Sequence, residues 1–174
     1  MAGPAAAEQY VGFVSRMVAQ GTAQHLFRAD VETRLLALLN AYRQAKGLKA
    51  LAADPALAAA ARAHAADMAL HGFLGHVAST GHDFDSRMHA LRGGALVLPS
   101  MGENAAEVPR PSEDPAVLAQ SLFQTWLASA PHLHTMVSRD YLKVATGVAI
   151  VNGKAYADQI FIGPEVQTNM LRAP

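Results

Sequence analysis

Apolar residues recur every three or four positions over five stretches of the chain, which is the spacing of an amphipathic helix. In the second stretch we expect Asp30 to be the N-cap, with Gly47 in the left-handed conformation just past the end. Two other stretches begin with an Asp-Pro pair, which suits an N-cap followed by the first helical position. The pattern therefore predicts helices over residues 8–20, 30–46, 54–71, 83–91 and 114–126.

The last third of the chain contains the strongest strand signal. Residues 144–151 and 154–162 are separated by Asn152-Gly153, a dipeptide typical of a two-residue hairpin turn. If the two strands pair next to this turn, both faces of the hairpin carry apolar side chains. One face carries Val148, Ile150, Ala155, Ala157 and Phe161, and the other carries Ala149, Tyr156 and Ile160. We therefore expect the hairpin to lie in a sheet that is covered on both sides.

The chain has 174 residues, of which 51% are hydrophobic, so its length suits one domain with a substantial core. Lys and Arg number 14, as do Asp and Glu, and this balance argues against a nucleic-acid partner. No apolar run is long enough to form a transmembrane segment. Arg16 interrupts the apolar stretch at the start, which does not resemble a signal peptide. The absence of cysteine excludes disulfides and zinc–thiolate sites.

Histidine supplies most of the candidate chemistry, with eight residues in a chain of few charges. The His-Glu-x-x-His, Gly-x-Ser-x-Gly and phosphate-loop motifs are absent. His64, Asp67 and His71 share one side of a predicted helix, where we interpret them as packing and helix-end residues in preference to a metal site. His132 and His134 form an H-x-H pair in a predicted loop or short helical turn. Taken alone, that pair fits a ligand site and surface histidines equally well.

Four short sequence blocks between Leu36 and Gly163 occur in the order that is typical of one protein family. The blocks are Leu39-Asn40-Ala41-Tyr42-Arg43 with Gly47-Leu48; Asp54-Pro55-Ala56-Leu57 through His64-Ala65-Ala66-Asp67-Met68-Ala69 to Gly75-His76; Gly102-Glu103-Asn104-Ala105-Ala106; and Trp126, Ser129-Ala130-Pro131-His132 and Gly147-Val148-Ala149. In this order they resemble a bacterial SCP-like member of the CAP superfamily, the cysteine-rich secretory, antigen 5 and pathogenesis-related proteins.

The resemblance implies an α+β fold, a three-layer α/β/α sandwich with a central antiparallel sheet. It places the CAP domain at residues 30–163, between an N-terminal helical extension (1–29) and a loose C-terminal tail (164–174). His76 and His132 match the two cleft histidines of the family, and Glu103 matches its Gly-Glu-Asn glutamate. Ser129 stands where animal and plant members carry a second glutamate. Ser129 and His134 are therefore secondary site candidates.

Two imidazoles and a carboxylate suit a divalent ion, zinc above all, with one position open for water. The same three residues could form a hydrogen-bonded cluster without metal, or only tie three loops together. No catalytic residue is assigned, because a nucleophile and an acid–base pair are lacking. We favour a non-catalytic module that binds a small or lipidic ligand over a metal-dependent hydrolase or a structural domain with a vestigial cleft. The resemblance also implies an extracellular or periplasmic location.

Overall fold

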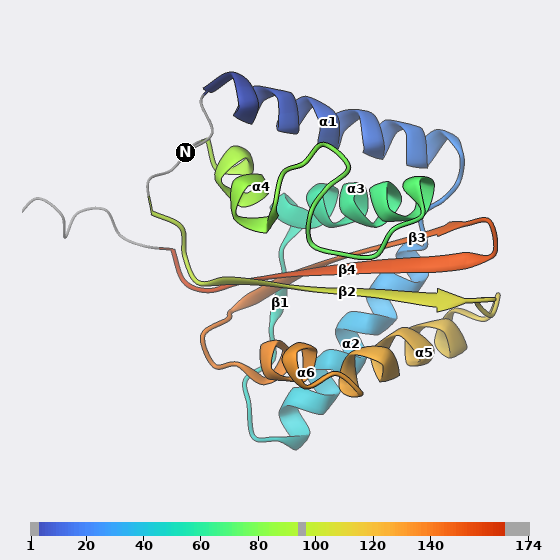
Figure 1. Ribbon diagram of the computed structural model, residues 1–174. Coiled ribbons are helices and arrows are strands. Elements are labelled where there is room, and N and C mark those ends of the chain that lie inside the picture. Colours follow the sequence, from blue (N-terminus) through green and yellow to red (C-terminus); the bar gives the residue numbers. More distant parts are fainter. Residues whose placement is uncertain (1–3, 94–96, 166–174) are drawn as a thin grey trace, which may run out of the picture.

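A four-stranded sheet separates two layers of helices in the computed structural model of the protein, which describes residues 4–93 and 97–165 (Figure 1). One layer contains α1 (Pro4–Ala23), α3 (Pro55–His71) and α4 (Phe84–Leu91). The other contains α2 (Ala29–Ala45), α5 (Pro115–Leu127) and α6 (Ala130–Val137). This arrangement confirms the predicted α/β/α sandwich.

The sheet has the strand order β1-β3-β4-β2. Its centre is the predicted hairpin of β3 (Lys143–Val151) and β4 (Lys154–Ile162), in which Val151 pairs with Lys154 as expected. The strand β2 (Met101–Pro109) pairs antiparallel with β4 and forms one edge. At the other edge, the two-residue β1 (Ala52–Ala53) runs parallel to β3. The strand β2 is not among the elements that the sequence pattern predicts.

Both faces of the hairpin are buried, as the sequence predicted. Val148, Ala157 and Phe161 belong to the core on the α2 and α5 side, whereas Ala149 and Tyr156 belong to the core under α1 and α3. Helix α3 lies directly on β3 at Gly147. A Cβ atom added there would lie 2.3 Å from the backbone carbon of Ala61, so the glycine permits the close approach.

Most of the predicted helix boundaries are confirmed. The side chains of Asp54 and Asp114 accept backbone hydrogen bonds at the starts of α3 and α5, and Gly47 and Gly72 have φ angles of 69° and 67°. The prediction that Asp30 caps α2 was wrong. This helix begins at Ala29 with Arg28 at the N-cap position, two residues earlier than an Asp30 cap implies, so Asp30 lies inside its first turn, where its carboxylate pairs with Arg28 at 2.9 Å.

The N-terminal helix is longer than predicted and packs onto the domain. Its apolar face, including Tyr10, Val14 and Met17, is buried in the same core as α3. Among the described residues, no helix is both long and apolar enough to cross a membrane. Most of the predicted loose tail, residues 166–174, lies outside the described residues.

Candidate functional site

Two neighbouring residues of the edge strand β2 reach into opposite layers of the sandwich. Glu103 lies on the α3 and α4 side, where its Oε2 is 2.7 Å from Nδ1 of His76, in the loop after α3. Asn104 lies on the other side, and its Nδ2 donates a hydrogen bond of 3.1 Å to the backbone carbonyl of His132 in α6. Adjacent strand residues alternate between faces, so one Glu-Asn pair contacts a histidine segment from each layer.

The carboxylate of Glu103 is almost completely buried and is bound by a buried arginine. Nη2 of Arg87, in α4, lies 2.6 and 2.8 Å from its two oxygens and also donates to the backbone carbonyl of His76 at 2.9 Å. Burial alone would raise the pKa of Glu103, but the hydrogen bond from His76 and the positive charge of Arg87 outweigh it and lower that pKa. Glu103 is therefore ionised and positions His76.

The two histidines of the predicted site have pKa values shifted in opposite directions. The hydrogen bond to Glu103 raises the pKa of His76, whose side chain is 52% exposed. Burial lowers the pKa of His132, and the positive charge of His76 lowers it further. His76 consequently holds a proton to higher pH than His132 does, and the two imidazoles are close enough to interact electrostatically.

The structure thus brings His76 and Glu103 into direct contact and places His132 nearby. These three residues do not present donor atoms that all lie within 4.8 Å of one another. Within residues 4–93 and 97–165, the set that does so is His64, Glu103 and Asp158, which shares only Glu103 with the predicted trio. Metal binding by the predicted trio stays a prediction.

The secondary candidates lie at the two ends of α6. Ser129 occupies the N-cap position of this helix, although its side chain makes no capping hydrogen bond. His134 lies in the last turn and is exposed, whereas His132 is half-buried. The two histidines are two residues apart on a helix and so diverge, as expected of a helical turn.

Three further charged or polar groups lie near Glu103, and the sequence analysis did not assign them to the site. Arg87 is the buried cation described above, and Asp158 on β4 is fully buried. Burial first, and then the negative charge of Glu103, raise the pKa of Asp158 well above its ordinary value. His64 is buried and its Nε2 lies 2.8 Å from the Gly75 carbonyl oxygen, so it is hydrogen-bonded and packed as predicted, while its Nδ1 has no partner among the described residues.

Only a weak signal for these residues is present in the sequence, and it does not show what they contact. Asp158 is a lone acidic residue in a strand that is apolar on both faces, and Arg87 is a charged residue within a short amphipathic helix. Asp67 pairs with His71 in the last turn of α3, at 2.8 Å from carboxylate oxygen to Nδ1. Asp67 also accepts hydrogen bonds from the backbone and hydroxyl of Ser79, so it stabilises the loop that carries His76.

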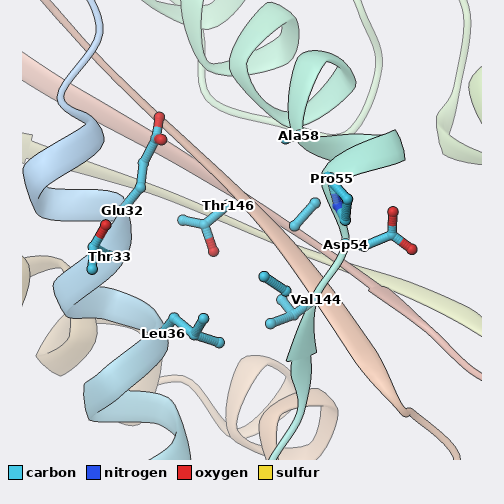
Figure 2. A pocket seen from close by; sticks show the side chains of 10 residues that line it. Glu32, Thr33, Leu36, Asp54, Pro55, Ala58, Val144 and Thr146 are labelled. Atoms are coloured by element: carbon cyan, nitrogen blue, oxygen red, sulfur yellow. The ribbon is translucent and has the colours of Figure 1, made fainter.

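A separate pocket lies beside β3, towards the opposite edge of the sheet. Figure 2 shows Glu32, Thr33 and Leu36 of α2 facing the start of α3 across this pocket. Its carboxylates already have structural partners: Glu32 pairs with Arg62 at 2.6 Å, and Asp54 caps α3. The rest of the lining is mainly apolar, so this pocket lacks the convergent polar groups of the His76 region.

A three-layer sandwich with a histidine–glutamate pair at its sheet edge is the architecture implied by the sequence resemblance. The profile of the cysteine-rich secretory protein family, known as CAP, matches residues 36–163. The chain therefore belongs to this family.

One curated relative and several solved structures resemble the chain. The uncharacterised protein YkwD of Bacillus subtilis is 28% identical over 132 residues, which cover 76% of this chain and 47% of YkwD. The chain thus spans about half the length of that relative. An extracellular SCP-domain protein of Bacillus anthracis is 24% identical over 77% of this chain and 40% of its own, with a TM-score of 0.59. An outer surface protein of Borrelia burgdorferi is 15% identical over 79% of this chain and 95% of its own, with a TM-score of 0.65. These two structures support the fold alone.

Proposed function

We propose that this chain is a non-catalytic binding module of the CAP family whose ligand site contains His76 and His132 at the β2 edge. The observation that carries the proposal is the hydrogen bond from His76 Nδ1 to the ionised, buried Glu103. A carboxylate that fixes the Nδ1 proton leaves Nε2 as the free lone pair of the neutral ring. Metal-binding histidines are commonly oriented in this way.

Zinc is the ion that this site is expected to bind. Imidazole nitrogen and carboxylate oxygen both suit it, and the chain offers no thiolate. Glu103 contributes by orienting His76 and is a direct ligand only if its carboxylate rearranges. Affinity should fall with decreasing pH, because protonated imidazole cannot bind metal. Because the pKa of His76 is raised, this loss of zinc affinity should occur at a pH above the usual histidine pKa of ~6.5.

The environment of Glu103 argues against catalysis. A general base should have a pKa near the working pH, whereas the pKa of Glu103 is lowered and its charge is paired with Arg87. Ser129 replaces the other carboxylate that some relatives provide. The opposite pKa shifts of His76 and His132 are the one observation that favours the alternative, a metal-dependent hydrolase, since such separation can assign an acid and a base.

A small or lipidic ligand and an extracellular or periplasmic location complete the proposal. The support for export is that similar proteins are described as extracellular or outer surface proteins. Fractionation of the source cells tests this part, and protein confined to the cytosol would contradict it.

Zinc titration by calorimetry tests the site. His132→Ala removes a proposed contact, and His134→Ala is the matched control because it removes an exposed imidazole from the same helix. We expect wild type and His134→Ala to show a zinc-binding event that His132→Ala lacks. Equal stoichiometry and heat in all three proteins would exclude His132 as a ligand, and zinc-dependent ester or peptide hydrolysis by the wild type would favour the hydrolase.

A further inference from the structure

A second set of potential metal ligands lies beneath the exposed histidine. His64 of α3, Glu103 of β2 and Asp158 of β4 each offer one donor atom, and these three atoms lie within 4.8 Å of one another. All three side chains are buried, in contrast to the half-exposed His76. The set is therefore distinct from the proposed ligand site, although both involve Glu103.

The orientation of His64 is that of a metal-binding histidine. Its Nε2 lies 2.8 Å from the Gly75 carbonyl oxygen, and because a carbonyl can only accept, Nε2 carries the proton. Nδ1 then presents a lone pair in a fully buried position, and it has no hydrogen-bond partner within the described part of the chain. A ring nitrogen that donates to a backbone carbonyl while the other faces a cation is a recurrent feature of metal sites.

Asp158 provides an independent indication of a ligand. Both of its carboxylate oxygens are buried, and neither accepts a hydrogen bond from an N–H or O–H donor among residues 4–93 and 97–165; the one side-chain hydrogen bond open to Asp158 is to Glu103 and requires a proton on one of the two carboxyl groups. It pairs in register with Ala105, two residues from Glu103 on the neighbouring strand, so both carboxylates face the α3 layer. A buried carboxylate that accepts no hydrogen bond from a donor group is uncommon, because desolvation is costly unless a cation, a shared proton or hydrogen bonds offset it.

The distances and charges suit a small divalent ion. Three atoms no more than 4.8 Å apart share a point at most about 2.8 Å from each, so shifts of less than about 1 Å would give zinc bond lengths of about 2.0–2.2 Å. Glu103 has enough lone pairs to accept Arg87 and His76 and still bind a metal. Arg87 balances one of the two carboxylates, which leaves an anionic set when both are ionised.

We propose that His64 Nδ1, Glu103 and Asp158 form a buried site for a divalent transition metal, with zinc the best fit to this donor set. A metal there would link α3 to two strands of the sheet, so its role would be structural. A proton shared between the two carboxylates is the competing explanation for the unpartnered oxygens of Asp158. The two explanations differ in whether the stability of the protein depends on metal.

Zinc content and thermal unfolding distinguish them. Asp158→Asn keeps the shape and removes the charge, and His64→Gln can retain the hydrogen bond to the Gly75 carbonyl while removing the donor at Nδ1. Each protein is loaded with zinc, dialysed, analysed for bound metal and melted with and without EDTA. We expect EDTA to lower the Tm of wild type and of His132→Ala. Both inner-site variants should contain about one zinc fewer than wild type, and EDTA should lower their Tm by less than it lowers the Tm of wild type, because only the surface zinc remains to be removed.

The His132→Ala protein separates this proposal from the proposed ligand site. Loss of zinc in His132→Ala but not in Asp158→Asn would overturn the buried site and leave the surface site intact. If neither zinc nor EDTA changes the Tm of the wild type, the buried metal site is overturned and the shared proton is the better explanation. If the inner-site variants do not fold, X-ray absorption of the zinc-loaded double variant His76→Ala/His132→Ala, which lacks both imidazoles of the surface site, decides instead. Zinc bound by one imidazole and by oxygen ligands would support the buried site. Absence of zinc, or zinc without an imidazole ligand, would refute it.

Discussion

Replacing Arg87 with methionine should destabilise the protein strongly, because the buried carboxylate of Glu103 would lose its cation. The Arg87–Glu103 pair is 2.6 Å long, with side chains 0% and 2% exposed. Removing one member of a buried pair costs about 3–5 kcal/mol, since the other charge stays desolvated. That loss is a large part of the about 5–15 kcal/mol by which domains are usually stable.

The chain contains a matched control for this prediction. Arg62 and Glu32 also approach to 2.6 Å, but their side chains are 34% and 11% exposed. Water can replace the lost arginine there, so Arg62→Met should cost about 1 kcal/mol. The two shortest distances are equal and Arg62 makes more hydrogen bonds to its carboxylate than Arg87 does, so a larger cost at Arg87 is attributable to burial.

The free energies of unfolding of both arginine variants can be measured by urea titration at pH 7 with EDTA present. Circular dichroism is the signal, and linear extrapolation gives the values in water. Adding Glu103→Gln to Arg87→Met removes the stranded charge. The double variant should therefore be less destabilised than the sum of the single variants, by about 1–3 kcal/mol. An additive cycle, or an Arg87→Met cost no larger than that of Arg62→Met, would refute the assignment of Arg87 as the counterion of Glu103.

Two other predictions concern packing and pH. Gly147→Ala should cost about 1–3 kcal/mol or more in urea unfolding, because its Cβ would overlap the backbone of Ala61, whereas Gly75→Ala, with nothing within 4 Å, should be nearly neutral. Asp158→Asn should be stabilising in EDTA, and increasingly so as pH rises. The folded-state pKa of Asp158 is raised, so the wild type loses stability above the unfolded value of ~3.9. A gain that is the same in urea titrations at pH 4 and pH 8 would contradict this reasoning.

Local chemistry explains which parts of the fold could be predicted. Asp54 and Asp114 specify helix starts through hydrogen bonds within a few residues, and Asn152-Gly153 specifies a hairpin for the same reason. The strand β2 was missed because its first half, around Glu103, lacks apolar alternation. Its extended structure depends on pairing with β4, some fifty residues later in the chain.

Only those residues of the site that belong to a recognisable sequence motif could be predicted. His76 and Glu103 were recognised by their sequence context, and their contact is observed. Arg87 and Asp158 become functional candidates only when α4 and β4 converge on β2. Neither residue has a short-range partner that would reveal its role in the sequence.

Glu103 and Asn104 lie on opposite faces of the edge strand β2, and this alternation also fixes the register in which β2 pairs with β4. A slip of β2 by one residue along β4 would turn Glu103 towards the apolar core around Trp126 and Phe161, away from Arg87. The carboxylate would then be buried without a cation, and the carbonyl of His132 would lose its donor. Register is strongly specified where a slip would bury the wrong side chains, and here the residues that build the candidate site also penalise the wrong register.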